Sequence, residues 1–163
     1  MLVLRLILRI FWTWRVRTSC QLAGTELRVN GTSRVTGKTV LGRNVNFNGM
    51  RVLGQGAVKF GDNFHSGKGC RIYTSMHNYN GTHLPYDSTV VNSDVTIGKN
   101  VWFGDGVCIL GQVTIGDGAI IQTNSVVVND IPAMSIAGGH PARVFAQRDK
   151  EHYNRLDQAQ AYH

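Results

Sequence analysis

The chain has 163 residues, of which 42% are hydrophobic and only 17% are charged. A chain of this length and composition can bury a core of its own as a single domain, which excludes an intrinsically disordered protein. Three cysteines, an odd number, argue against a disulfide framework and favour a reducing compartment.

The net charge of +7 is distributed unevenly. Residues 1–90 carry twelve Lys and Arg against three acidic residues, whereas residues 91–163 carry five against seven. The basic half suits an anionic membrane surface, an acidic sugar acceptor or the phosphates of a cofactor. We expect no nucleic-acid partner, because the basic residues are scattered and no binding motif accompanies them.

The first segment, residues 1–28, opens with an apolar stretch that four arginines interrupt. A membrane-spanning helix needs ~20 mostly apolar residues, and a signal peptide keeps its charges ahead of its apolar run, so neither fits. Arg5, Arg9 and Thr13 share one helical face, which predicts an amphipathic helix. This helix either packs on the rest of the protein or on a neighbouring subunit, or it lies at a membrane surface.

Residues 29–132 follow a period of six, which is clearest from residue 91, where seven successive blocks open with an aliphatic or aromatic residue. Helices repeat about every 3.6 residues and half-buried strands about every 2, so this period requires a backbone that turns a corner once per block. Gly, Asn and Asp inside the blocks supply the conformations that corners need. Three blocks make one triangular coil of a parallel β-helix, and the whole stretch predicts about five coils.

The frame is weaker in the first half of this stretch. We expect a one-residue insertion at Val58 or Lys59 to absorb a shift in the period, and Cys70 to fill the core as a small hydrophobe. The block openings fall at Val29, Val35, Leu41, Phe47, Leu53, Phe60, Ser66 and Ile72.

Two segments lack the period. Residues 77–90 form a loop with glycine turns and a proline, and because packing does not demand such a loop, function is expected there. Residues 133–163 are expected to form a cap, with a short polar helix from Asp149 onward, because an open β-helix end exposes unpaired backbone.

The run IGKNVWFGDGVCILGQVTIGDGAIIQTNSVVVNDIPAMSIAGGHPARV, with a histidine on the preceding loop, resembles the signature of the left-handed β-helix O-acetyltransferases. The resemblance covers roughly residues 41–146 and is to the maltose, galactoside and nodulation-factor group and to related capsule and lipopolysaccharide enzymes. It implies an all-β, left-handed parallel β-helix, acetyl-CoA as co-substrate, and a homotrimer with each active site between two neighbouring chains.

The resemblance places His77 on the catalytic histidine of the family. Transfer of acetyl to a sugar hydroxyl requires that the hydroxyl lose its proton, and neutral imidazole suits that role near pH 7. Asn48 matches an asparagine that works beside this histidine and holds the acceptor, although asparagine is also an ordinary corner residue. Tyr79, His83 and Asp87 on the loop are candidates for contact with the acceptor, and His83 has no matching role in the family.

The family pattern also indicates residues for acetyl-CoA. Trp102 corresponds to a tryptophan beside the pantetheine arm, although an outward tryptophan could instead serve a subunit contact, and Arg143 corresponds to a basic residue that reaches the phosphates. Asp105 and Thr123 are assigned to the same cofactor. The chain departs from the pattern in two places, because Val128-Asn129 replaces Thr-Lys and residues 122–124 replace Gly-Ala-Gly.

We therefore predict a cytoplasmic acetyl-CoA-dependent O-acetyltransferase that acts on a surface-polysaccharide or lipid-linked glycan precursor, with a contact at the inner membrane face as an option. One alternative is a zinc-dependent, γ-type carbonic anhydrase-like protein, for which His65, His77 and His83 are the available ligands. Because their spacing lacks the close pair of that family, no metal site is predicted. Another alternative is a non-catalytic β-helix binding protein.

Overall fold

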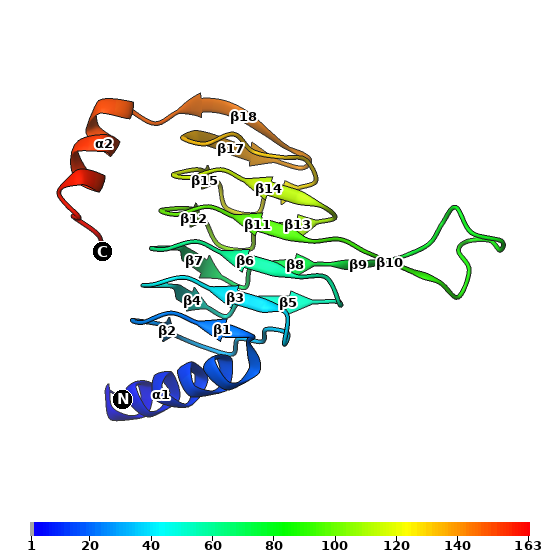
Figure 1. Ribbon diagram of the computed structural model, residues 1–163, viewed down its shortest axis with the longest axis horizontal. Helices are drawn as coiled ribbons and strands as arrows, with labels where there is room; N and C mark the ends of the chain where they lie inside the picture. The colour runs from blue at the N-terminus through cyan, green and yellow to red at the C-terminus, as the bar shows by residue number, and fades with distance from the viewer. Residues whose placement is uncertain (1) are drawn as a thin grey trace.

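The computed structural model describes residues 2–163, so Met1, the first residue of the predicted N-terminal segment, lies outside the described residues. Three sheets form the sides of a triangular prism (Figure 1). The first face contains β1 (Leu22–Ala23), β3 (Thr39–Leu41), β6 (Val58–Phe60), β11 (Val95–Ile97) and β14 (Val113–Ile115). The second face contains β2 (Arg28–Val29), β4 (Asn46–Asn48), β7 (His65–Lys68), β12 (Trp102–Phe103), β15 (Ile120–Ile121), β17 (Ser135–Gly139) and β18 (Ala142–Gln147). The third face contains β5 (Arg51–Leu53), β8 (Arg71–Tyr73), β13 (Cys108–Leu110) and β16 (Val126–Val127).

The chain visits the three faces in the same order in every coil, and the fold is a left-handed parallel β-helix of about six turns. The predicted fold class is confirmed. The stack has one turn more than the period suggested, because it begins at Leu22, where β1 pairs with β3, rather than at Val29. At the other end it continues beyond Pro132 into β17, which pairs with β15.

Inward side chains of successive coils stack to make one continuous core. Phe60 and Phe64 lie edge to face with ring centroids 4.8 Å apart, and Phe64 meets Phe103 of the next coil at 5.0 Å. Cys70 belongs to this core as expected, and burial raises the pKa of its thiol to about 11.

One block opening was wrong. Val52, not Leu53, is buried, and it pairs with Ile72. The expected insertion at Val58 or Lys59 is also displaced, because β6 pairs with β3 in unbroken register. The irregularity lies between Asn46 and Asn48, opposite β7, and in the turn that follows β5.

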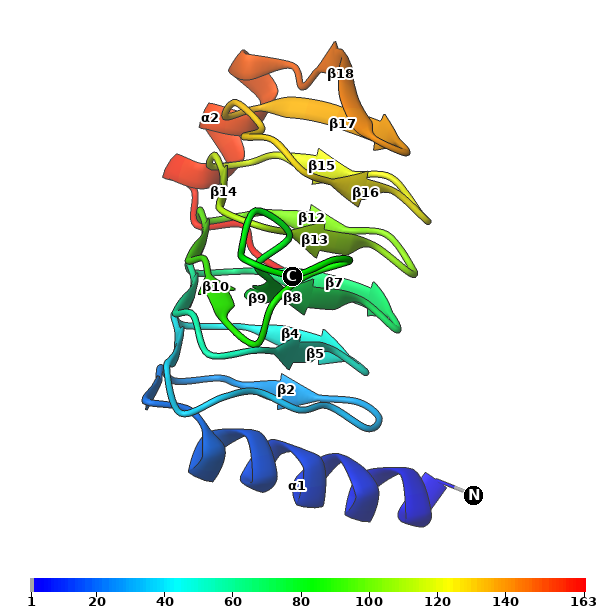
Figure 2. The same ribbon diagram turned by 90° about the vertical axis from the view of Figure 1, so that its right-hand side faces the viewer.

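Helix α1 (Leu2–Ser19) lies across one end of the prism, beneath β1 and β2 (Figures 1 and 2). Val16 is buried against the first coil, and the Thr13 hydroxyl accepts a hydrogen bond from the Val29 N–H at 3.1 Å. The helix thereby covers an end that would otherwise expose unpaired backbone. Within residues 2–163, no helix is long and apolar enough to cross a membrane.

The opposite end is closed by the antiparallel pair β17 and β18. Helix α2 (Lys150–Gln158) then returns along the side of the prism (Figure 1). Asp149 caps α2 by accepting a hydrogen bond from the His152 N–H at 2.8 Å, so the polar helix begins where the sequence indicated.

Candidate active site

A long hairpin projects from the third coil (Figure 1). Its stem is the antiparallel pair β9 (Ser75–His77) and β10 (Val90–Asn92), in which His77 faces Val90. The hairpin is an insertion between two successive coils. Neighbouring residues of these two coils are therefore 37 positions apart in the sequence rather than 18, as in the hydrogen bond from the Lys68 N–H to Asp105. His77 is exposed at the end of this stem, and its ring stacks on Tyr86 at a centroid distance of 3.9 Å.

Of the other predicted loop residues, Asp87 is hydrogen-bonded within the loop, whereas Tyr79 and His83 are exposed. The Asp87 carboxylate accepts hydrogen bonds from the N–H groups of Thr82 at 3.1 Å and of Thr89 at 2.9 Å, and from the Thr89 hydroxyl. These donors, the Thr89 hydroxyl first, lower the pKa of Asp87. The carboxylate oxygens of Asp87, a residue predicted to contact the acceptor, therefore also help to shape the loop. Tyr79 and His83 are exposed, and His83 Nδ1 lies 3.0 Å from the Thr82 hydroxyl.

The second face carries a groove of about 580 Å³ lined by Trp102, Gly104, Thr123 and neighbouring residues of β15 and β17. Trp102 is 54% exposed on β12, between His65 of β7 and Ile120 of β15. Two residues assigned to acetyl-CoA from the sequence, Trp102 and Thr123, therefore share one groove.

Asp105 and Arg143 lie near this groove without lining it. The Asp105 carboxylate accepts a hydrogen bond from the Lys68 N–H at 2.6 Å, as Asp62, Asp94, Asp117 and Asp130 do for backbone N–H groups elsewhere in the stack. Arg143 is exposed on β18 opposite Gly138, at the end of the second face, and its Nη1 donates to the neighbouring Ala142 carbonyl at 3.1 Å.

Asn48 ends β4 on the same face. Its Nδ2 donates to the Ser66 carbonyl at 2.7 Å, and the side chain borders a cleft of about 440 Å³ that also contains Arg51, Lys68 and Arg71. This cleft lies at the corner between the second and third faces and is separate from the Trp102 groove, so the structure places the two parts of the predicted site at different positions on the prism.

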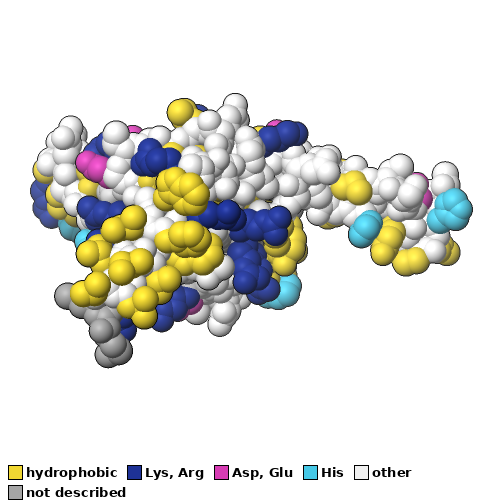
Figure 3. All heavy atoms as spheres, turned by 90° about the horizontal axis from the view of Figure 1, so that it is seen from below, with side chains coloured by type: hydrophobic (Ala, Val, Ile, Leu, Met, Phe, Trp, Pro, Cys, Tyr) yellow, Lys and Arg dark blue, Asp and Glu magenta, His cyan; other side chains and the backbone are white. Residues whose placement is uncertain are grey.

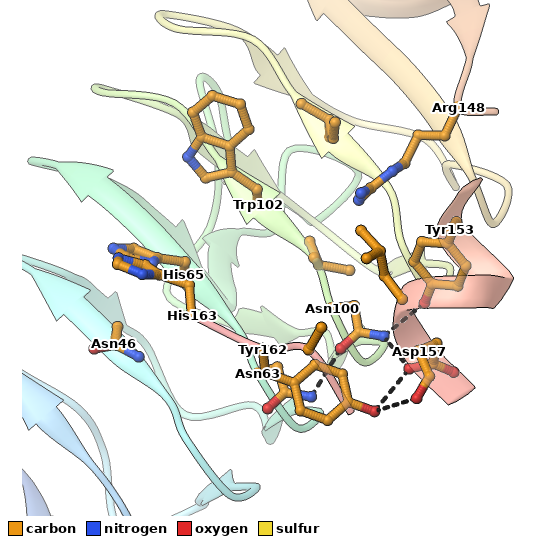
Figure 4. A pocket seen from close by; sticks show the side chains of 14 residues that line it. Asn46, Asn63, His65, Asn100, Trp102, Arg148, Tyr153, Asp157, Tyr162 and His163 are labelled. Carbon is orange, nitrogen blue, oxygen red and sulfur yellow. Dashed lines mark hydrogen bonds between the residues drawn. The ribbon is translucent and has the colours of Figure 1, made fainter. Parts of the chain in front are cut away.

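A third cavity, of about 660 Å³, lies between the second face and α2 (Figure 4). A ladder of asparagines holds the helix there: Asn63 donates to Asn100 at 2.8 Å, and Asn100 donates to the Tyr153 hydroxyl at 2.7 Å and to Asp157 at 2.8 Å. Asn63 and Asn100 have positive φ angles of 56° and 57°, which asparagine tolerates at a corner. Sequence reasoning missed this cavity, and the repeated corner asparagines were its only signal.

The same cavity contains His65 and His163, whose rings stack with centroids 5.8 Å apart. Burial, followed by the proximity of His163, lowers the pKa of His65. His65 on β7 is thus remote in the fold from the loop histidines His77 and His83. Across residues 2–163, no three His, Cys, Asp or Glu side chains gather where they could hold a metal ion.

One copy of the chain does not bring the predicted residues together. The hairpin with His77 projects from the side of the prism opposite to α2, whereas Trp102 borders the cavity beneath α2 (Figures 1 and 4). The imidazole and the groove of one chain therefore face different directions.

Fold and repeat define a hexapeptide-repeat β-helix, and comparison with known proteins narrows the class. The family described as bacterial transferase hexapeptide (six repeats) matches residues 94–129. The solved maltose O-acetyltransferase from Clostridium difficile 630 is 30% identical, with a TM-score of 0.74 over 82% of this chain and 73% of that one. The chain belongs to the hexapeptide-repeat acetyltransferase family.

Two further relatives are similar over much of the fold. Galactoside O-acetyltransferase of Escherichia coli strain K12 is 35% identical over 118 residues, which are 69% of this chain and 57% of that protein. A solved galactoside acetyltransferase in complex with coenzyme A is 27% identical, with a TM-score of 0.66 over 81% of this chain and 68% of that one. The chain spans about half the length of the curated relatives it matches.

Proposed function

We propose that the protein transfers acetyl from acetyl-CoA to a carbohydrate hydroxyl. The observation that carries this proposal is His77, an exposed imidazole on a hairpin that the packing of the coils does not require. Membership of an acetyltransferase family and the groove beside Trp102 and Thr123 support the same reaction.

In the proposed reaction, His77 takes the proton of the acceptor hydroxyl as its oxygen attacks the thioester carbonyl. A carbon–oxygen bond forms, the carbon–sulfur bond breaks, and the departing thiolate receives the proton from the imidazolium. Stacking on Tyr86 fixes the plane of the ring and leaves its nitrogen-bearing edge open.

Asn48 is proposed to hold the acceptor. Its Nδ2 is committed to the Ser66 carbonyl, and among residues 2–163 no donor occupies its Oδ1, so this oxygen can accept a hydrogen bond from a sugar hydroxyl. Trp102 and Thr123 are proposed to line the pantetheine path, with Asp105 at its edge and Arg143 near the phosphates. Tyr79, His83 and Asp87 are proposed as candidates for acceptor contact, and Asp87 also holds the loop through its hydrogen bonds to Thr82 and Thr89.

The active site is proposed to lie between copies in a homotrimer. The opposite orientations of the hairpin and of the Trp102 groove support this arrangement, because a neighbouring prism can place its groove under the projecting imidazole. The substrates would then meet between a loop of one copy and the second face of the next.

The acceptor is proposed to be a glycan precursor carried on a lipid at the cytoplasmic face of a membrane. Support comes from α1, whose outer surface exposes Ile7 (56%), Phe11 (45%) and Trp14 (57%). The helix carries four arginines and no acidic residue, and Figure 3 shows its hydrophobic side chains gathered on the underside with Lys and Arg around them. Such a surface suits the interface of an anionic bilayer.

The test is direct. The protein is incubated with acetyl-CoA and a panel of nucleotide sugars, lipid-linked glycans and simple glycosides, and acceptors are examined for the mass of one added acetyl group. Acetylation of a glycan with release of free coenzyme A thiol is the expected result. Release of thiol without any acetylated glycan, or no turnover with the whole panel, would contradict the proposal.

A further inference from the structure

Three arginines stack on the outer surface of the third face. Arg34 bridges to Arg51 in the next coil, and Arg51 pairs with Arg71 in the coil after that. All three side chains are exposed, and neighbouring strands lie about 4.8 Å apart. Like charges directly opposite one another in a sheet are destabilising, so this arginine ladder, Arg34–Arg51–Arg71, has a cost in the isolated chain.

No carboxylate within residues 2–163 forms an ion pair with the ladder. The ion pairs within residues 2–163 are Arg43 with Glu26 and Lys99 with Asp157, and neither includes a ladder residue. Asp105 is the acid of the adjoining corner, and its Oδ1 is bonded to the Lys68 N–H. The ladder and the Lys68 side chain therefore present concentrated positive charge to solvent.

The ladder borders a formed cleft rather than a flat surface. The cleft of about 440 Å³ contains Arg51, Arg71 and Lys68, and glycines form part of its lining. Gly69 has a φ of +68°, and a Cβ placed on it would meet no atom within 4 Å, so its lack of a side chain keeps that part of the cleft open. Asn48, the residue proposed to hold the acceptor, lines the same cleft.

We infer that this cleft binds the diphosphate group of the acceptor, an assignment that rests on the proposed function. Guanidinium groups present paired N–H donors that match phosphate oxygens, and two successive rungs can engage two linked phosphates. A diphosphate joins a sugar either to a nucleoside or to a membrane lipid. The ladder starts in the coil next to α1 and ends at Arg71, which begins the strand leading into the His77 hairpin. Figure 3 shows Lys and Arg side chains between the hydrophobic underside and the root of that hairpin.

Binding is tested first without catalysis. The melting temperatures of the full chain, of Arg51→Gln and of Lys59→Gln are measured with inorganic pyrophosphate and with chloride at equal ionic strength. Lys59 is a matched control because it is exposed on the first face between Val40 and Thr96, with no stacked cation. Pyrophosphate should stabilise the wild type and Lys59→Gln but not Arg51→Gln, whose melting temperature without ligand should equal or exceed that of the wild type. Equal stabilisation of all three proteins would overturn the site.

Kinetics then assign the ligand. Arg51→Gln should raise KM about tenfold to a hundredfold for a diphosphate-bearing acceptor and leave KM for acetyl-CoA and for a neutral glycoside unchanged. The same comparison is made with a nucleoside-diphosphate sugar and with a lipid-diphosphate sugar in vesicles. The acceptor whose KM rises more in Arg51→Gln is the source of the diphosphate. A rise in KM for acetyl-CoA alone would overturn the assignment to the acceptor. Pyrophosphate binding that depends on Arg51 in a protein without transferase activity would contradict the proposed function and leave the anion site standing.

Discussion

His77 stands on a hairpin whose shape is set by hydrogen bonds inside the loop rather than by the core. Asp87 ties together the N–H groups of Thr82 and Thr89, and Tyr86 supplies the flat surface on which the imidazole rests. An imidazole held in this way is oriented by its own loop, and the packing of the stack does not restrict access to it.

Replacing His77 with alanine should lower the rate of acetyl transfer by about 10²- to 10⁴-fold, because the acceptor hydroxyl loses its proton acceptor. The affinity for coenzyme A should be unchanged, because His77 is proposed to act on the acceptor hydroxyl, whereas the cofactor contacts are assigned to Trp102 and Thr123. The measurement is the rate of thiol release together with coenzyme A binding by calorimetry. His152→Ala, an exposed histidine on α2 with no proposed part in the reaction, should retain activity. Full activity in His77→Ala would remove this base from the mechanism.

At the residue scale, periodicity predicted which side chains point inward, and it predicted Cys70 correctly because burial follows the place within a block. Periodicity did not distinguish polar residues that bind a ligand from polar residues that hold the fold together. Asp105 and Asp87 carry the same side chain that the fold uses repeatedly to accept backbone N–H groups. The roles of the predicted site residues stay predictions, because hydrogen bonding at a corner leaves no mark in the sequence that distinguishes it from ligand binding.

Helix α2 shows how an element outside the repeat is held by corner residues. Asp157 accepts hydrogen bonds from Lys99 at 2.8 Å, from Asn100 and from the Tyr162 hydroxyl. Lys99 first, and then these donors, lower the pKa of Asp157 to about 2 from an ordinary value of 3.8. None of these contacts follows the period of six, which is why the sequence predicted a helical cap but not the cavity beneath it.

The docking of α2 should therefore depend on pH. A carboxyl whose pKa is lower in the folded state stabilises that state above its ordinary pKa, and the contribution is lost as pH falls through the folded value. The hydrogen-exchange protection of residues 150–158, relative to the intrinsic exchange rate at each pH, should decrease as pH falls from about 4 to about 2. Asp157→Asn should remove most of this dependence, whereas Glu151→Gln on the same helix should keep it. An identical pH profile in Asp157→Asn would contradict the assigned role.

Helix α1 closes one end of the stack with one side and exposes an apolar surface with the other. Ile7→Glu and Phe11→Glu should each weaken binding to vesicles that contain anionic lipid, because a charge enters the apolar face. Binding of the wild type should fall as salt rises, since the arginines act through a screened field. Vesicle flotation measures both effects. Phe145→Glu, an equally exposed position on β18 at the other end of the stack, should have no effect. Unchanged flotation of Ile7→Glu would exclude α1 as the membrane contact.

The whole molecule is a triangular prism with an apolar, arginine-bearing helix at one end, a projecting hairpin that carries His77, and a groove and a cavity on its second face. The fold class was readable from the sequence because one block pattern, repeated, determines both core and corners. The number of coils was harder to predict, since the first coil begins with the two-residue strand Leu22–Ala23 and shows little of the period of six. The direction in which the hairpin projects from the stack could not be read at all, because residues 77–90 lack the period of six.

The most direct test of a site shared between copies is complementation. His77→Ala and Trp102→Ala chains are each expected to be inactive alone, and Trp102 is exposed enough to be replaced without disturbing the core. When the two are co-expressed and assembled at random, about a quarter of the sites should combine an intact loop with an intact groove, so about a quarter of wild-type acetyl transfer should return. The double variant co-expressed with wild type gives the reference for random mixing. No recovery in the mixture of single variants would contradict a site formed by the hairpin of one copy and the groove of its neighbour.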